Sequence, residues 1–282
     1  MLASLIIRPG VARTEERSAL SGKLLYSRLT DGTWQIWQTD LVTRAQAQVT
    51  ASPGDKRKPA WTPDGRVGYH TSNHGYHLID PAGQHDEPFL SALWPLIDVA
   101  WAPGGARVVF SKLQPELVDQ ANLWVTDLSG DNRQVLTHEA GLQYDSAWSL
   151  DGQHLVYVQG HGYGTSELYA INADGSGRIQ LTHNQTRELS PAWSPDGKWI
   201  AFVSDASGDF EIWVIRPDGT ESTQLTSSPG LDANPAWSPD GQRLVFATTR
   251  SGTMELWVMH ADGTDQQLLE HADGGGCDPA WR

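Results

Sequence analysis

Ala192-Trp193-Ser194-Pro195-Asp196-Gly197 decides the fold, because it recurs almost unchanged at 236–241. Looser copies that keep the Ala-Trp pair begin at positions 60, 100, 147 and 280. The tryptophans of successive copies are about 40 to 47 residues apart, which is the repeat length of a four-stranded propeller blade. The sequence therefore predicts a β-propeller before any other residue is considered.

One complete unit, residues 189–226, shows what each repeat should form. Ser194-Pro195-Asp196-Gly197 has the composition of a tight turn, with proline where φ is fixed and glycine where φ can be positive. Two β-rich runs follow, at 199–204 and 210–215, and Thr223-Gln224-Leu225-Thr226 closes the unit. No segment has an apolar period of 3.6 over about ten residues, so we expect almost no helix. The unit is predicted to be an antiparallel meander of four strands.

The two partial repeats at the ends complement each other. Residues 23–50 supply three strands without the Ala-Trp strand, and 277–282 supply that strand alone. We therefore expect an all-β, six-bladed propeller whose ring is closed by the C-terminal strand, which completes blade one. The expected divisions are an N-terminal arm at 1–22 and one propeller domain at 23–282, with blades at 23–50 plus 277–282, 51–90, 91–137, 138–182, 183–226 and 227–270.

Composition excludes several classes of protein. The net charge of −14 argues against nucleic acid as a partner. Cys277 is the only cysteine, which excludes an internal disulfide and a multi-cysteine metal site. No run approaches the roughly 20 apolar residues of a membrane span, and the apolar stretch 1–7 is too short for the core of a standard signal peptide.

Three features together resemble the TolB-type β-propeller repeat over residues 23–282. They are the Ala-Trp-Ser-Pro-Asp-Gly phrase, the segment 204–213 (Ser-Asp-x-x-Gly-x-x-x-Ile-Trp) and an Asp-Gly turn followed by Leu-Thr. The resemblance implies a periplasmic scaffold that binds other envelope proteins, although related propellers also cap the hydrolase domain of prolyl-oligopeptidase-like peptidases. TolB also has a separate N-terminal α/β domain, and in this sequence only the 22-residue arm stands at that place. The compartment stays open between periplasm, if the protein follows TolB, and cytoplasm, since no standard signal peptide is visible.

A search for catalytic motifs leaves one histidine cluster. The sequence contains no Gly-x-Ser-x-Gly nucleophile motif and no phosphate-binding glycine motif. His70, His74 and His77 could place two imidazoles on a zinc or iron if they met at one hairpin, with a polar loop as the alternative. The acidic run 205–211 superficially resembles a calcium loop, but it lacks the distal glutamate and occupies an ordinary hairpin position.

Function should concentrate on the rim opposite the Ser-Pro-Asp-Gly turns, in the variable segments before each Ala-Trp pair. The residues three positions before each innermost tryptophan are predicted to surround the mouth of the central channel: Lys58, Asp98, Asp145, Ser190, Asn234 and Asp278. We expect Asp278 and Asp98 to neutralise Lys58, which would leave negative charge near Asp145 for a cation or ordered water. No other cofactor is expected. Around this mouth we expect a partner-binding rim of residues typical of binding hot spots: Arg57, Trp94, Tyr144, Tyr163, Arg187 and Glu188.

These observations favour a monomeric, non-catalytic scaffold that binds a protein or peptide on the channel-mouth rim, without nucleic acid and without membrane insertion. Two alternatives remain. One is a metal-dependent lyase or hydrolase that uses the channel and His70, His74 and His77. The other is an accessory propeller of a serine peptidase.

Overall fold

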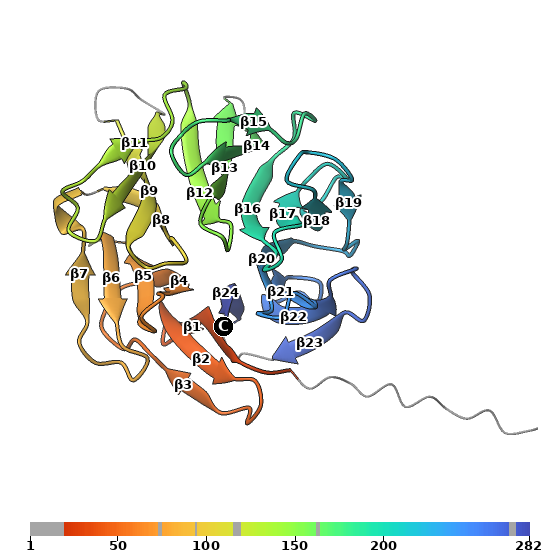
Figure 1. Cartoon of the computed structure of the whole chain (residues 1–282). Coiled ribbons are helices and arrows are strands. Elements are labelled where there is room, and N and C mark those ends of the chain that lie inside the picture. The colour runs from red at the N-terminus through yellow and green to blue at the C-terminus, as the bar shows by residue number, and fades with distance from the viewer. Residues whose placement is uncertain (1–19, 73–74, 94, 115–119, 162–163, 271–274) are drawn as a thin grey trace, which may run out of the picture.

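The computed structural model describes residues 20–72, 75–93, 95–114, 120–161, 164–270 and 275–282. These residues form 24 β-strands and one short 3-10 helix, η1. The strands are grouped in sheets arranged around a central axis, so the fold is an all-β propeller with four-stranded antiparallel blades (Figure 1). The described residues contain no helix with the length and apolar character needed to cross a membrane.

The strand bounds follow the repeat from one sheet to the next. The sheet β24-β1-β2-β3 consists of Gly276–Trp281, Lys23–Thr30, Thr33–Asp40 and Gln46–Gln48. Strands β4 to β7 are Lys56–Trp61, Val67–Thr71, Gly75–Ile79 and Glu87–Phe89, and η1 is Ser91–Leu93. Strands β8 to β11 are Leu96–Trp101, Arg107–Leu113, Ala121–Asp127 and Gln134–Val135.

The second half of the chain continues in the same way. Strands β12 to β15 are Leu142–Trp148, His154–His161, Thr165–Asn172 and Ile179–Gln180. Strands β16 to β19 are Glu188–Trp193, Ile200–Ser204, Glu211–Ile215 and Thr223–Gln224. Strands β20 to β23 are Asp232–Trp237, Arg243–Thr248, Glu255–His260 and Gln267–Glu270. One parallel pairing, Ala121 with Leu142, joins the strands β8–β11 and β12–β15 into a single eight-stranded sheet.

The repeated turn is held by its own side chains. Ser194 Oγ donates to Asp196 Oδ1 at 2.7 Å and accepts from the backbone N–H of Trp199 at 3.0 Å. Gly197 closes the turn by donating to the Ser194 carbonyl, with φ at +70°, a conformation that costs glycine little. The Ser-x-Asp-Gly pattern is therefore explained by the structure of the first hairpin.

The chain ends meet in one sheet, as the partial repeats predict. Strand β24 pairs antiparallel with β1, with Leu24 opposite Trp281 and Leu25 opposite Ala280. Lys23 and Arg282 exchange two backbone hydrogen bonds, at 2.7 and 2.9 Å. The C-terminus consequently lies near the centre of the ring (Figure 1).

The core is built of aromatic rings between neighbouring sheets. The second strand of every repeat contributes one fully buried ring: Tyr26, Tyr69, Phe110, Tyr157, Phe202 and Phe246. Of the innermost tryptophans, Trp148 and Trp237 are buried, and their indole N–H groups donate to the carbonyls of Ala100 and Ala192 in the preceding repeat. The other innermost tryptophans are only half-buried, so the second-strand rings carry more of the core than the repeat phrase suggests.

Candidate functional site

The predicted channel-mouth residues lie together around one cavity. A cavity of about 200 Å³ is lined by all six of them, and the His70 ring joins them: Lys58, Asp98, Asp145, Ser190, Asn234 and Asp278. They come from the innermost strands β4, β8, β12, β16, β20 and β24, which surround the centre of the ring in Figure 1. Counting back from each tryptophan thus identified residues that converge in space.

A backbone irregularity turns these side chains toward the axis. Each innermost strand shifts register by a β-bulge next to this position, for example between Arg57 and Ala60 in β4 and between Leu189 and Ala192 in β16. Five of the six residues have a positive φ, between +48° and +53°: Lys58, Asp145, Ser190, Asn234 and Asp278. This conformation is uncommon for lysine and serine, and such strain is concentrated at functional sites.

The charges pair differently from the expectation. Lys58 Nζ lies 2.6 Å from Asp145 Oδ1, across the mouth, rather than between Asp98 and Asp278. Burial disfavours its ammonium charge, but the carboxylates of Asp145, Asp98 and Asp278 outweigh burial and raise the pKa of Lys58. The expectation of unbalanced negative charge at Asp145 is therefore corrected, because the long lysine side chain reaches beyond its neighbours.

Asp278 joins three sheets at the mouth. Its Oδ2 accepts hydrogen bonds from Ser27 Oγ at 2.9 Å and Arg57 Nε at 2.8 Å, and from the Lys58 backbone N–H at 3.2 Å. Its Oδ1 accepts from Asn234 Nδ2 at 3.1 Å. Burial alone would raise the pKa of Asp278, but these donors, led by Arg57, hold it below its usual value.

Asp98 is buried and acts within the scaffold. Its carboxylate accepts from the backbone N–H groups of Ser111 at 3.0 Å and Ser146 at 2.8 Å, and so connects β9 with β12. Burial, followed by the charge of Asp145, raises its pKa. Asp98 therefore shapes the floor of the mouth more than it presents a charge to a ligand.

The histidines do not form one cluster. In the β5–β6 pairing His70 is opposite Tyr76, and His77 is opposite Tyr69, so the two imidazoles project from opposite faces of the sheet. His70 lines the mouth, and burial followed by the Lys58 charge lowers its pKa to about 3, whereas His77 Nδ1 lies 3.0 Å from Asp86 Oδ1. His74 lies outside the described residues. Within the described part of the chain no group of three or more His, Cys, Asp or Glu side chains could hold a metal ion.

Two rim arginines are held in the same way. Arg57 pairs with Asp278 and stacks on Trp34 at 4.3 Å, and Arg187 pairs with Asp205 at 2.7 Å and stacks on Phe210 at 4.4 Å. Their side chains are 42% and 51% exposed, respectively. Each guanidinium is therefore presented to solvent in a fixed orientation.

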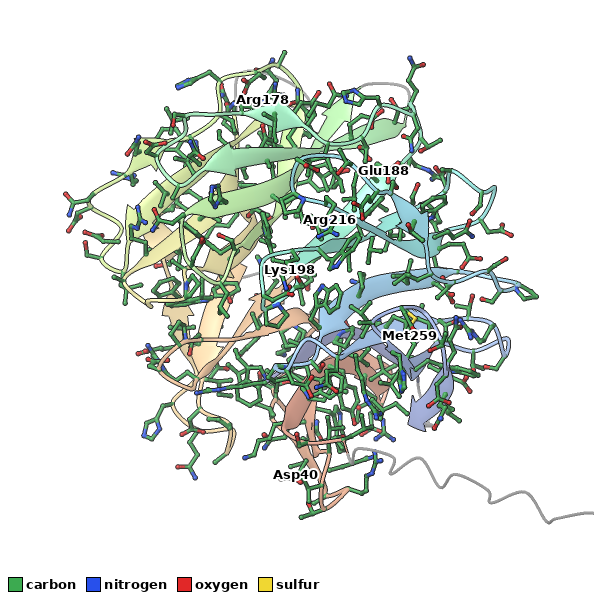
Figure 2. The ribbon with its side chains drawn as sticks, turned by 45° about the vertical axis from the view of Figure 1, so that its right-hand side comes forward. Asp40, Arg178, Glu188, Lys198, Arg216 and Met259 are labelled. Atoms are coloured by element: carbon green, nitrogen blue, oxygen red, sulfur yellow. The ribbon has the colours of Figure 1, made fainter. Side chains whose placement is uncertain are left out.

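The other predicted rim residues differ in availability. Tyr144 is half-buried, and burial raises the pKa of its phenol. Trp94 and Tyr163 lie outside the described residues. Glu188 is corrected: it is fully buried at the start of β16 and lies among the strands in Figure 2, because its alternation along the strand points it into the sheet junction.

A larger cavity on the opposite rim was missed from the sequence. It has a volume of about 520 Å³ and lies between the turns of β12–β13 and β16–β17, where Trp193, Leu150 and Ile179 line it. The indole N–H of Trp193 is buried without a partner among the described residues, unlike those of Trp148 and Trp237. The sequence signal for this cavity was Leu150, which replaces the proline of the phrase. In the structure its side chain is 61% exposed.

The comparisons with known proteins agree on the fold. The chain is similar to TolB from Acinetobacter baumannii (23% identity, TM-score 0.80), over 92% of this chain and 66% of that one. It also resembles an oligogalacturonate lyase in complex with manganese (19% identity, TM-score 0.64, 89% of this chain and 74% of that one). A third similar structure is the tricorn protease (17% identity, TM-score 0.66, 90% of this chain and 27% of that one).

These identities establish the architecture alone, and the chain spans slightly less than two thirds of the Acinetobacter protein. No curated protein sequence matches the chain. The profile of the TolB beta propeller domain matches residues 76–216 and 189–282, well over half of the sequence. The chain belongs to the TolB beta propeller domain family.

Proposed function

We propose that this propeller is a non-catalytic scaffold that binds a protein or peptide partner on the channel-mouth rim. The observation that carries the proposal is the matched pair of exposed arginines, Arg57 and Arg187, each fixed by a carboxylate and an aromatic ring. Ordered arginine beside aromatic surface is typical of binding hot spots, because little side-chain entropy is lost on association.

The proposed partner presents an acidic or carbonyl-rich segment to these arginines. A guanidinium presents its remaining N–H donors in a planar fork that suits carboxylate and backbone oxygens. The cavity of about 200 Å³ at the channel mouth accepts a side chain or a chain end rather than a folded domain. Its polar lining, with Lys58, Ser190 and Asn234, suits hydrogen bonding to such a segment.

We also propose that the ring has six blades. The eight-stranded sheet divides between β11 and β12, because only the single parallel pairing of Ala121 with Leu142 connects its two halves. The six copies of the Ala-Trp strand support this division.

Binding can be tested with two variants that each remove an arginine side chain stacked on an aromatic ring and paired with a carboxylate. Arg187→Ala removes a rim cation, whereas Arg216→Ala removes a guanidinium that stacks on Trp199 at 4.1 Å and pairs with Glu221 near the opposite rim (Figure 2). Each protein is used to capture partners from an extract of the source organism, and a captured protein is purified and titrated calorimetrically. We expect Arg187→Ala to weaken binding about tenfold or more and Arg216→Ala to leave it unchanged. Equal affinity of all three proteins would refute the rim as the binding surface.

The metal-dependent alternative is less well supported, because His70, Asp145 and Asp278, all within the described residues, line the same mouth but do not form a group that could hold a metal ion. Metal analysis of the purified protein tests it directly. Stoichiometric zinc, iron or manganese that is lost in His70→Ala would favour an enzyme over a scaffold.

A further inference from the structure

Because the sequence repeats, equivalent buried residues can be compared at each contact between two neighbouring sheets, here called a sheet junction. The residue two positions before the aromatic residue of a third strand lies beside the residue five positions before the next innermost tryptophan. In one junction these two residues are Glu211 and Asp232, which are 4% and 0% exposed. Arg250 completes this pair, with its Nη2 2.9 Å from Asp232 Oδ2.

At other sheet junctions, different hydrogen-bond partners compensate the buried polar atoms of the two equivalent residues. Asn122 Nδ2 donates to Gln143 Oε1 at 3.0 Å. Lys56 Nζ donates to three backbone carbonyls at 2.5 to 2.8 Å, and two of these carbonyls, Ser52 and Gly54, also accept from Gln35. Paired amides or a cation therefore compensate the buried polar atoms at these places.

Glu167 and Glu188 occupy this position between the strands β12–β15 and β16–β19, without an arginine. They are 3% and 0% exposed. The residue equivalent to Arg250 is Ala206, and the backbone N–H groups of both donate to the hydroxyl two residues earlier, on Thr248 and Ser204. The two loops therefore share this backbone contact, and the guanidinium of Arg250 has no counterpart at Ala206.

The contacts leave one oxygen of each carboxylate unsatisfied. Glu188 Oε1 accepts three hydrogen bonds, from Asn184 at 2.7 Å, Thr186 at 2.9 Å and Ser204 at 3.0 Å, and Glu167 Oε1 accepts from the Gln185 backbone N–H at 2.7 Å. Glu188 Oε2 and Glu167 Oε2 are buried and have no hydrogen-bond partner among the described residues. A buried carboxylate oxygen without a donor is costly, because it has lost its hydration.

One covering segment contacts both carboxylates, with Asn184 donating to Glu188 and the Gln185 N–H donating to Glu167. Ser166 Oγ donates to the Glu188 carbonyl at 2.8 Å and accepts from the Glu188 N–H at 3.0 Å. Gln185, at φ +59°, turns its N–H onto Glu167. The loop 183–185, which covers the two carboxylates, is exposed.

We propose that Glu167 and Glu188 bind a calcium ion at this sheet junction, in the place where the neighbouring acid pair has Arg250. The two side chains offer hard carboxylate oxygens, and the hydroxyl groups of Thr186 and Ser204 lie beside Glu188, whereas Asn184 presents its amide nitrogen. Oxygen-only sites with carboxylates suit Ca²⁺, whose coordination shell of about six to eight ligands tolerates irregular geometry and bound water.

Protons compete with the ion at this site. Burial, reinforced by the charge of Glu167, raises the pKa of Glu188 to about 7, so below that pH a proton occupies the carboxylate that the ion would bind. Calcium affinity should therefore fall when the pH is lowered from 8 to 6.

The experiment is a calcium titration of the metal-free full chain by calorimetry, with thermal unfolding in 1 mM CaCl₂ or EDTA. We expect one ion per chain and a rise in Tm of roughly 3–5 °C. Glu167→Gln should lose binding. Ala206→Arg should lose the calcium response while its Tm in EDTA exceeds that of wild type, because the new guanidinium replaces the ion.

The matched control is Glu211→Gln, which alters the acid pair that already has an arginine and should keep the calcium response. Absence of stoichiometric binding to wild type at pH 8 would overturn the proposal. Calcium binding that persists in both Glu167→Gln and Ala206→Arg would also overturn it, because the ion would lie elsewhere. A Tm that depends on pH but not on calcium would assign the pair to a shared proton instead.

Discussion

At the scale of single residues, the channel mouth combines backbone strain with dense charge pairing. Asp278 receives five hydrogen bonds from three sheets, and Lys58 crosses the mouth to Asp145. The same side chains thus close the ring and form the floor of the proposed binding rim. The effect of a substitution at the mouth on stability should therefore be measured separately from its effect on binding.

Arg57→Ala should destabilise the protein by about 1–2 kcal/mol at pH 7, since Asp278 loses a charged donor but keeps four others and Arg57 is partly exposed. The pKa of Asp278 is held below 3.8, so its stabilising contribution is present above that value and is lost as pH falls through the lowered pKa. The difference in Tm between wild type and variant should therefore shrink below about pH 4. Thermal unfolding at pH 7 and pH 3 measures it, and an equal difference at both values would assign the effect to packing on Trp34.

Glu188→Gln should remove a pH dependence measured in EDTA. The folded pKa of Glu188 is about 7, raised from 4.5 by burial, so its neutral form stabilises the fold below pH 4.5 and this stabilisation is lost as pH rises through 7. Glutamine stays neutral, so the variant should match wild type near pH 5 and exceed it at pH 8 by on the order of 2–3 kcal/mol. Urea unfolding at the two pH values tests this. A parallel pH profile of both proteins would contradict it.

At the scale of elements, the second strand of each repeat carries the core. Its aromatic ring is fully buried in every sheet, while most innermost tryptophans are half-buried. The sequence phrase that makes the repeat visible is therefore a turn motif, and the apolar strand after it supplies most of the packing.

Phe246→Ala should lower the free energy of unfolding by about 3–5 kcal/mol, because a fully buried ring leaves a cavity between β21 and the neighbouring sheet. Leu150→Ala, at a side chain that is 61% exposed, is the control and should change stability by less than about 0.5 kcal/mol. Both are measured by urea unfolding. A small loss for Phe246→Ala would mean that the sheets repack around the gap.

At the scale of the whole molecule, closure depends on strand β24. It pairs with β1 and contributes Asp278 to the mouth, so the last residues of the chain hold both the seam and the proposed site. An open ring would expose the edge of β1 and its apolar residues, which favours aggregation.

Deletion of residues 276–282 should abolish the single cooperative unfolding transition and produce aggregates on size-exclusion chromatography. Arg282→Ala, which keeps the strand and its backbone bonds to Lys23, should elute like wild type and have a Tm close to that of wild type. A truncated protein that unfolds cooperatively would show that the ring does not need its seam.

The sequence by itself determined the propeller, the strand that closes it and the six positions around the mouth. These follow from local rules: turn chemistry at Ser-x-Asp-Gly, alternation along short strands, and a repeat that places equivalent residues at equivalent radii. The predicted mouth residues converge because each repeat adds one of them at the same place on its innermost strand.

The tertiary structure alone decided which charges pair and which side chains are buried. Lys58 pairs with Asp145 because a long side chain can cross the axis, and Glu188 leaves the rim because its strand register points it inward. His70 and His77 separate because they lie on opposite faces of one sheet, and the orphaned oxygens of Glu167 and Glu188 emerge only when adjacent sheets are packed. Such contacts join residues from different repeats, and their distances depend on how the sheets pack, which no local pattern in the chain encodes.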